Sequence, residues 1–493
     1  MNHSGFIFKR TIISLAFIFL CQPIVIQAEA AVITFLPRLS VEEEYTSNFF
    51  LTRDREEDDF STIVTPGFVT QLQGKMSSIA FYYDPAYHYY SDHTEYNGWS
   101  HSAGLTGTHR AAKNTTIDFV NSFLYTSEPS VTPNTVATYM GESSTTESSV
   151  TRPAPSFDSG PTHISGSSGA TSSFDSIGSQ DTQILNRDIS LRRSRETYYT
   201  NNANLGLTRQ FGINDSMHLD YTYTILENDD PGIDDNQSHS PSILFSYWFV
   251  PNQWRVETGG AYTRGLYDGL SDDFNSWQAD VEIFRQFDRH IEGLIRYSHS
   301  SISFDGDTED YQVYNPSIGI RYITQEGTNI HVSVGYYVQD RKISEDDSGF
   351  IVNCDLEKSW SYRQASIQLS GSSGYDLSYL DAANLGFRLY YGAGINAQYR
   401  FTRHTTGYLF SSYQWDDYPS DPSSAGEDRE DHNLEYGLGF SYRALSWLST
   451  RIQGSTRLVK SSIHVSDPDD DPDFVDNRVL LGITISPSQP YRY

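Results

Sequence analysis

One stretch of sequence, 433–458, indicates the fold most clearly. It consists of Asn433-Leu-Glu-Tyr-Gly-Leu-Gly-Phe-Ser-Tyr-Arg443, a link Ala-Leu-Ser446, and Trp447-Leu-Ser-Thr-Arg-Ile-Gln-Gly-Ser-Thr-Arg-Leu458. Side chains alternate between the two faces of a strand, so each of the two long parts has one apolar face and one polar face. The three-residue link between them favours an antiparallel hairpin. The polar faces carry charged side chains, which suits a wall between lipid and water.

The same hairpin unit recurs along the chain, with short links alternating strictly with longer, acidic connections. That alternation is typical of outer-membrane barrels, with short periplasmic turns and long outer loops. Nine short links and ten longer ones join 20 strands, and an even number puts both chain ends on the periplasmic side. The short links are predicted at 74–77, 111–114, 212–215, 251–253, 288–290, 325–329, 361–364, 402–404 and 444–446.

The predicted fold is therefore an all-β, transmembrane, antiparallel up-and-down β-barrel. We expect about 20 strands (18–22), short periplasmic turns and long acidic extracellular loops. The two least certain regions are 33–45 and 374–389. A soluble β-solenoid would need a fixed repeat of about 20–30 residues, and the irregular spacing here disfavours it.

The N-terminus has the features of a secretory signal peptide. Lys9 and Arg10 precede an apolar run over 12–20, and Ala28 and Ala30 offer cleavage sites. The apolar run is too short to be a spanning helix. We therefore predict a signal peptide over 1–30 and a single barrel over 31–493, located in the cell outer membrane.

Cysteine usage and charge narrow the class further. Beyond the leader only Cys354 remains, so no intramolecular disulfide can form; a lipoprotein on Cys21 is disfavoured by the large Leu20 before it. The formal charge is −29, from 34 Lys and Arg against 63 Asp and Glu, which argues against nucleic acid as a partner. A hydrophobic fraction of 37% is low for packed soluble domains and suits a barrel around water.

The segment 128–195 breaks the strand rhythm. It is rich in Ser, Thr, Gly and Pro and lacks periodicity, a composition that does not bury enough apolar surface to fold alone. We predict one long extracellular loop, either disordered at the surface or folded into the lumen as a constriction. Its basic end is placed to reach the barrel mouth and contains Arg187, Arg192, Arg193 and Arg195.

Charged residues within the strands are the candidate lining of the lumen. If the turn at 288–290 pairs Phe287 with Ile291, then Glu282 lies opposite Arg296. An Arg or Lys facing lipid costs about 2–4 kcal/mol at the bilayer midplane, so these residues belong inside. They either line a polar passage or stiffen the wall as cross-strand ion pairs. The predicted lumen-facing residues are Arg255, Glu257, Asp280, Glu282, Arg296, Arg321, Glu435, Arg443, Arg451 and Arg457.

No motif for catalysis or metal binding stands out. Asp467, Asp469, Asp471 and Asp473 are clustered carboxylates of the kind that bind calcium, but their spacing fits no EF-hand loop, so a solvated acidic loop is preferred. The sequence contains no Gly-x-Ser-x-Gly elbow and no His-Glu-x-x-His zinc motif. We predict no enzyme, no cofactor and no metal, with a site formed across strands as the less favoured alternative.

Two blocks near the N-terminus resemble a known family. They read Pro37-Arg-Leu-Ser-Val-Glu-Glu-Glu-Tyr-Thr-Ser-Asn48-Phe-Phe-Leu and Asp59-Phe-Ser-Thr-Ile-Val-Thr-Pro66-Gly67-Phe. The Tyr-x-x-Asn-Phe-Phe and Thr-Pro-Gly elements resemble the opening of β-barrel porin proteins found with exopolysaccharide and capsule loci, including PEP-CTERM/exosortase systems. The match is specific over about 40 residues and elsewhere rests on strand rhythm and length.

The resemblance implies an outer-membrane barrel that serves polysaccharide export or anchorage, and it supplies no catalytic residues. The chain departs from the family in the 128–195 insertion and in a proline-containing tail after Ile485 that ends at Tyr493. We predict a porin-like conduit for hydrated solutes or an exported polysaccharide. The alternative is a non-conducting structural or surface-interaction barrel plugged by its long loop. The expected partners are outer-membrane lipid, lipopolysaccharide, the barrel-assembly machinery and the polysaccharide cargo.

Overall fold

A computed structural model describes residues 32–54, 56–129, 195–212, 214–229, 234–269, 271–324, 328–362, 364–378, 386–418, 429–462 and 472–493. In these residues the chain forms 21 strands and one short 3-10 turn, η1 (Thr94–Tyr96), and no helix in them is long and apolar enough to cross a membrane. The strands are β1 (Val32–Thr46), β2 (Asp59–Gln73), β3 (Ser77–Tyr90), β4 (Gly98–Ala112), β5 (Thr115–Thr126), β6 (Tyr198–Gln210), β7 (Ser216–Asn228), β8 (Asp235–Val250), β9 (Trp254–Asp268), β10 (Phe274–Gln286), β11 (Ile291–Phe304), β12 (Tyr311–Thr324), β13 (Thr328–Arg341), β14 (Asp347–Ser361), β15 (Ala365–Ser378), β16 (Gly386–Arg400), β17 (Thr405–Tyr418), β18 (Arg429–Leu445), β19 (Leu448–Ser461), β20 (Phe474–Ile485) and β21 (Tyr491–Arg492).

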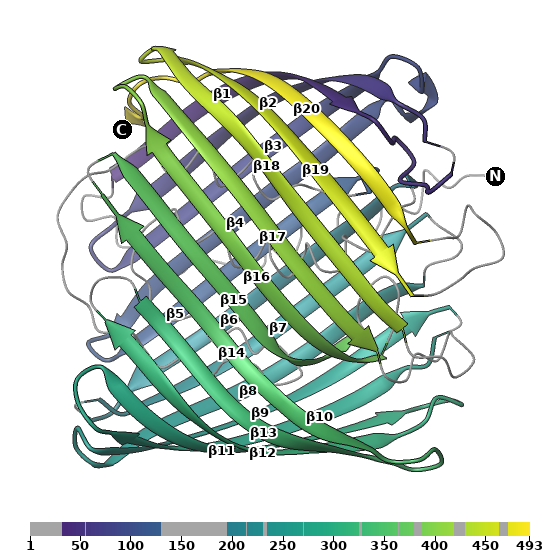
Figure 1. Cartoon of the computed structure of the whole chain (residues 1–493). Helices are drawn as coiled ribbons and strands as arrows, with labels where there is room; N and C mark the ends of the chain where they lie inside the picture. The colour runs from purple at the N-terminus through teal and green to yellow at the C-terminus, as the bar shows by residue number, and fades with distance from the viewer. Residues whose placement is uncertain are drawn as a thin grey trace.

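Each strand from β1 to β20 pairs antiparallel with the next, and β20 pairs back with β1 (Figure 1). The sheet is thus a closed barrel of 20 strands, which confirms the predicted fold and strand number. All nine predicted short links fall between consecutive strands, from the β2–β3 turn to the β18–β19 turn. They gather at one end of the barrel, called here the short-turn end. The strand ends that the ten longer connections join lie at the opposite end, called here the long-loop end.

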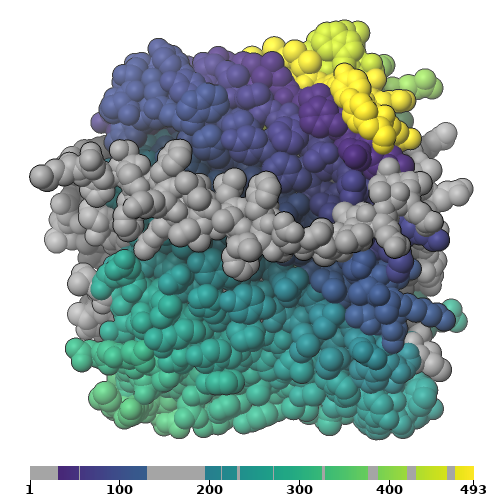
Figure 2. Space-filling model, turned by 180° about the vertical axis from the view of Figure 1, so that it is seen from behind, coloured from purple at the N-terminus to yellow at the C-terminus, as the bar shows by residue number. Residues whose placement is uncertain are grey.

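The outer face of the wall is apolar. Ile295, Ile318, Val334 and Val352 form one row across β11 to β14, with side chains 61%, 65%, 47% and 42% exposed. Along each strand, outward side chains alternate with inward ones. Most of the inward side chains of β10 and β11 are almost fully buried. Figure 2 shows part of the outer surface, with the N-terminal strands in purple and blue and later strands in teal. An apolar outer belt around a polar inner face is the arrangement predicted for a lipid-facing barrel.

The proline-containing tail rejoins the sheet next to β1. After Ile485 the chain leaves the ladder, and Tyr491 and Arg492 of β21 then pair with Phe35 and Thr34. The Tyr493 backbone N–H donates to the Ile33 carbonyl at 2.9 Å, and the reciprocal bond measures 3.1 Å. The terminal aromatic residue therefore lies in line with the β1–β20 closure despite the intervening prolines.

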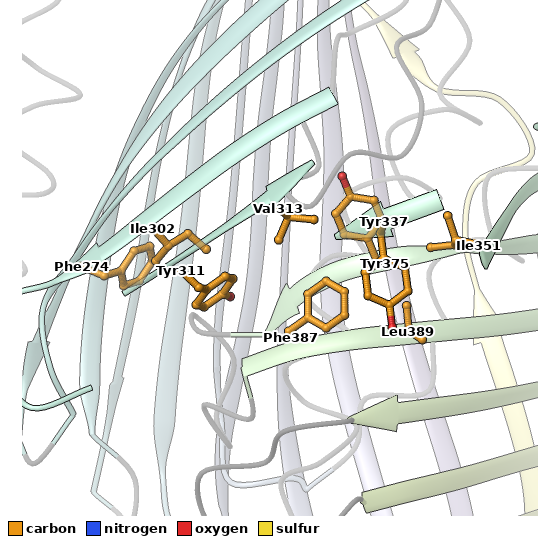
Figure 3. Close-up of a cluster of buried hydrophobic side chains, with 9 residues drawn as sticks. All are labelled: Phe274, Ile302, Tyr311, Val313, Tyr337, Ile351, Tyr375, Phe387 and Leu389. Atoms are coloured by element: carbon orange, nitrogen blue, oxygen red, sulfur yellow. The ribbon is translucent and has the colours of Figure 1, made fainter. Parts of the chain in front are cut away.

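The β15–β16 hairpin leaves the wall at its long-loop end. Tyr375 donates a hydrogen bond of 3.4 Å to Ser298 on the inner face of β11, and the Phe387 ring lies 5.6 Å from the Tyr337 ring on β13. These contacts place the hairpin inside the barrel, where its side chains complete an apolar cluster (Figure 3). The inner apolar cluster comprises Phe274, Ile302, Tyr311, Val313, Tyr337, Ile351, Tyr375, Phe387 and Leu389.

Candidate functional site: ion pairs on the inner face

A group of charges lies on the inner face of β9 to β12, toward the short-turn end, and is named the basal network. Its centre is Arg296, whose Nη2 lies 2.9 Å from Asp280 Oδ1 and whose Nε lies 3.3 Å from Glu282 Oε1. Glu282 stands opposite Arg296 in the β10–β11 register, which confirms the predicted pairing. The network comprises Arg255, Glu257, Asp280, Glu282, Glu292, Arg296 and Arg321.

The second half of the basal network is organised around an aromatic ring. Arg255 contacts Glu257 at 2.9 Å and Glu292 at 3.2 Å. The guanidinium carbons of Arg255 and Arg321 lie 4.2 Å and 5.0 Å from the centroid of Phe284. A cation over an aromatic face is attracted by the ring quadrupole, so Phe284 holds two arginines close to the acids. The basal network thus contains three arginines and four carboxyl groups.

Other predicted residues lie near the β1–β20 closure. Arg451 contacts Glu42 at 3.4 Å across the barrel seam. Glu435 stands opposite Arg457 in the β18–β19 register, and Arg443 is half-buried beside an irregularity near the short-turn end. Of the ten predicted residues, seven are under 9% exposed, and Glu435, Arg443 and Arg457 are half-buried. Their role as the lining of a passage remains a prediction.

The Thr-Pro-Gly element has a structural reason at Gly67. Arg38 on β1 reaches across β2 to Asp84 on β3 and makes a two-pronged ion pair, with Nε 3.0 Å from Oδ1. Gly67 lies directly opposite Arg38, and a Cβ atom there would sit 2.0 Å from the Asp84 carboxylate. The missing side chain therefore makes room for the ion pair. Sequence reasoning singled out this glycine but not its purpose.

The Asn-Phe-Phe element forms part of a second site at the long-loop end, named the mouth cluster and made of Phe49, Tyr90, His93, Glu128 and Arg195. The Arg195 guanidinium lies 3.5 Å from the Phe49 ring centroid, and its Nε donates to the Phe49 carbonyl at 2.9 Å. Arg195 also contacts Glu128 at 3.2 Å, and Tyr90 donates a hydrogen bond to the same carboxylate. The His93 ring stacks on the other side, 4.2 Å from Phe49.

The link between β1 and β2 is held in place by its own hydrogen bonds. Asn48 is fully buried, and its amide donates to the carbonyls of Thr52 at 2.7 Å and Val475 at 3.0 Å. Leu51 adopts a φ of 53°, a left-handed conformation that a branched side chain rarely takes. These contacts press Phe49 against Arg195. Two phenylalanines inside an acidic loop are visible in the sequence, but nothing there indicates which residues pack against them.

The mouth cluster joins the two ends of the 128–195 segment, because Glu128 follows β5 and Arg195 precedes β6. Of the predicted basic end, Arg195 lies at the mouth, whereas Arg187, Arg192 and Arg193 fall outside the described residues. The proposed constriction by this loop likewise lies outside them and stays a prediction.

Two groups of the mouth cluster have shifted pKa values. Burial opposes ionisation of Glu128, but Arg195, His88 and the Tyr90 hydroxyl outweigh it and hold the pKa of Glu128 at about 2. Burial likewise opposes protonation of His93, but hydrogen bonds to Glu57 and Asp59 outweigh it and raise the pKa of His93. The His93 nitrogens lie 2.9 Å from Asp59 and 3.0 Å from Glu57.

The acidic loop that was weighed as a calcium site lies largely outside the described residues. Asp467, Asp469 and Asp471 are not described, and Asp473 accepts a hydrogen bond of 2.6 Å from the Ser461 backbone N–H. Within the described ranges no group of three or more His, Cys, Asp or Glu is placed to hold a metal ion. The solvated acidic loop, preferred over a calcium site, and the absence of enzymatic activity both stay predictions.

The sequence matches no protein-family model and no curated protein. The chain is similar to three solved structures. The siderophore receptor PirA from Pseudomonas aeruginosa is 9% identical with a TM-score of 0.45, and the match covers 92% of this chain and 80% of that chain. The outer membrane protein OpdK from Pseudomonas aeruginosa (9% identity) and OccAB4 from Acinetobacter baumannii (10% identity) each have a TM-score of 0.37, and each match covers 93% of this chain and 99% of the other. These likenesses do not bear on what the lumen of this barrel passes.

Proposed function

We propose that this chain is an outer-membrane barrel that passes hydrated polar solutes, with an exported polysaccharide as its cargo. The observation that carries the proposal is the contrast between the two faces of one wall. Ion pairs lie on the inner face both at the basal network and near the β1–β20 seam, while the outer face presents a row of exposed Ile and Val. Charges inside and apolar groups outside fit a barrel with lipid around it and water within.

The polar side chains on the inner face of β6 to β9 favour a sugar chain as the cargo. Its inner face carries amide and hydroxyl groups that bond to one another, as in Asn204 to Thr222 at 2.9 Å and Ser240 to Thr263 at 3.0 Å. Such groups both donate and accept hydrogen bonds, so they can exchange partners with sugar hydroxyls without leaving a buried charge unpaired. The N-terminal resemblance to barrels of exopolysaccharide loci favours the same cargo.

A second candidate is a structural or surface-interaction barrel with a closed lumen. The observation that favours it is the inward β15–β16 hairpin, whose Tyr375 and Phe387 add apolar groups to the inner face. An apolar constriction opposes the passage of hydrated solutes. The two candidates differ in one measurable property, the conductance of the barrel.

The test is single-channel conductance of the refolded mature protein in a planar bilayer. The comparison is a variant that lacks 131–193 and so keeps Glu128, Arg195 and the mouth cluster intact. Conductance steps from the intact protein support the conduit, and steps that appear only after deletion make the loop a plug. If neither protein conducts, and both are shown to be folded by heat-modifiable gel mobility, the conduit is overturned and the structural barrel remains.

The cargo is tested separately on a conducting protein. We expect neutral oligosaccharides of increasing length, added on one side, to interrupt the current for times that grow with chain length. Polyethylene glycols of similar mass, which lack sugar hydroxyls, serve as the control for simple crowding of the pore. Interruptions that do not depend on chain length would remove polysaccharide as the cargo and keep the small-solute conduit.

A further inference from the structure

The wall between β14 and β15 is paired over only part of its height. β14 pairs with β13 as far as Asp347, opposite Gln339. On its other side, the last pair with β15 is Cys354 with Ser373. Over 347–353 the described residues of β15 form no ladder pairs with β14, although both strands continue toward the long-loop end. One side-chain bond remains, because the Ser373 hydroxyl donates a hydrogen bond of 2.6 Å to the Val352 carbonyl.

The ladder ends there because β15 turns inward. Gly371 and Gly374 belong to the run Ser370-Gly-Ser-Ser-Gly374, and glycine-rich strands bend easily and fix their register weakly. Immediately after this run Tyr375 reaches Ser298 on β11, far from β14 in the sheet order. The hairpin thus exchanges pairing with β14 for packing inside the barrel.

The open edge joins two apolar surfaces. On the outer side of β14, Phe350 is 80% exposed and Val352 is 42% exposed, and Val352 continues the apolar belt. Between them Ile351 points inward, is 1% exposed, and belongs to the inner apolar cluster with Tyr337 and Val313. Figure 3 shows Ile351 near Tyr337 and Tyr375. Apolar side chains therefore follow one another from the outer belt, around the β14 edge, to the buried cluster on the inner face.

The height of the open edge suits the outer part of the membrane. A barrel strand needs about 9–11 residues to cross a bilayer, and Cys354 is the eighth residue counted from Ser361 at the short-turn end. The edge therefore opens where hydrocarbon gives way to headgroups. Unpaired backbone groups are not tolerated against hydrocarbon alone, so the occupant of this edge needs a polar part as well as an apolar one.

We propose that the β14–β15 seam is a side entrance for the acyl chain of a membrane lipid, with the chain entering along Ile351 toward the inner apolar cluster. The lipid is favoured over other occupants because the seam is continuous with the lipid-facing belt. Its headgroup supplies partners for β14 backbone groups that have no ladder pair on β15, and its chain packs among the apolar side chains at the edge. This entrance goes beyond the proposed conduit, which runs along the barrel axis.

The test uses the native sequence in vesicles of phosphatidylcholine that carries a diazirine near the end of one acyl chain. After illumination, labelled residues are mapped by mass spectrometry. We expect labels on belt residues such as Ile318 and also on Ile351 and Val313. Ser238 on β8 and Thr263 on β9 are inward, equally buried controls in a sealed wall, and they should stay unlabelled. Labels on the belt with none on Ile351 or Val313 would overturn the side entrance and leave membrane insertion established.

A matched pair of variants locates the entrance. Val352→Arg places a charge beside the seam, and Ile318→Arg places one in the same outer row two strands away. We expect Val352→Arg to lower labelling of Val313 roughly fivefold relative to the belt, as a charge near the membrane interface disfavours an acyl chain. Ile318→Arg should leave the ratio unchanged. Equal ratios of Val313 to belt labelling in the two variants, with folding of each shown by heat-modifiable gel mobility, would show that lipid does not enter at the seam.

Discussion

The basal network and the mouth cluster are both buried groups of charges, but they are assembled over different distances in the chain. In the basal network Arg296 and Asp280 are 16 residues apart, and neighbouring hairpins supply all seven residues. In the mouth cluster Arg195 is 146 residues from Phe49 and 67 from Glu128. The first is therefore a product of local strand register, whereas the second depends on the first six strands bringing separate loops together.

The largest expected effect is in the basal network, where Arg296→Met leaves Asp280 and Glu282 buried without their guanidinium. Removing one partner from a buried ion pair destabilises a protein by about 3–5 kcal/mol. Lys342→Met is the control, because Lys342 pairs with Asp310 at 3.2 Å but is 70% exposed. Such surface pairs contribute about 0–1 kcal/mol.

The measurement is the free energy of unfolding in urea for both variants and the native protein, in the same lipid or detergent. If Arg296→Met cost no more than Lys342→Met, the basal network would not be a buried ion-pair system. In that case water inside the barrel would have to reach Asp280 and Glu282.

A somewhat smaller effect is expected at Gly67, which lies beneath the Arg38–Asp84 ion pair. Like the basal network, that ion pair joins strands that are close together in the chain. Gly67→Ala would force its Cβ into the Arg38–Asp84 ion pair, and overpacking of this kind costs about 1–3 kcal/mol. Gly454→Ala is the control, because a Cβ there meets nothing within 4 Å. The free energy of unfolding of the two variants decides between them. Similar values would mean that Asp84 moves aside at no cost and that Gly67 has another purpose.

Local register explains why so much of the barrel was predictable from the sequence. Alternating side chains and polar links indicated 20 strands and nine turns, and the turn at 288–290 was enough to place Glu282 opposite Arg296. Each of these features depends on residues within one hairpin. Alternation also separated inward charges from outward ones, but it could not tell the buried Arg296 from the half-buried Arg443, because burial depends on what faces each residue across the lumen.

The features that sequence reasoning missed all depend on distant contacts. Nothing near Phe49 in the sequence indicates that Arg195 will stack on it, since the contact exists only once β1, β3 and β6 are in place. The inward turn of β15 was equally hidden. Residues 374–389 were recognised as uncertain, and the reason is now visible: packing of Tyr375 and Phe387 inside the barrel overrides continued pairing with β14.

A different pH dependence should distinguish the mouth cluster from the rest of the wall. The pKa of Glu128 is depressed to about 2, so its contribution is present above its ordinary value of 4.5 and is lost as pH falls toward 2. The pKa of His93 is raised, so its contribution is present below its ordinary value of 6.5 and is lost as pH rises through the folded-state pKa. The mouth cluster should therefore contribute most between about pH 4.5 and 6.5.

The measurement is the free energy of unfolding against pH for the native protein and Glu128→Gln. At pH 5.5 we expect the variant to be less stable by about 1.5 kcal/mol, the size of a hydrogen bond to a charged group. The difference should shrink as the pH falls from 4.5 toward 2, because protonation removes the same charge from the native protein. A difference that stayed constant down to pH 2 would show that the Glu128 charge does not support the cluster.

The smallest effect is expected at Asp288, in the turn that allowed the basal network to be predicted. Its carboxylate accepts backbone hydrogen bonds from His290 at 2.6 Å and Ile291 at 2.9 Å, which hold the pKa of Asp288 below its ordinary value. Asp288→Ala removes both bonds from a solvent-exposed turn.

A one-residue slip of the strands would turn Glu282 and Arg296 toward lipid and their apolar neighbours inward, so the two faces hold the register without the turn. We therefore expect Asp288→Ala to unfold with a midpoint close to that of the native protein. Combined with Arg296→Met it should add nothing to the loss from Arg296→Met alone. A larger loss in the double variant would mean that the turn and the ion pair fix the register together, and that the basal network is less local than its sequence suggests.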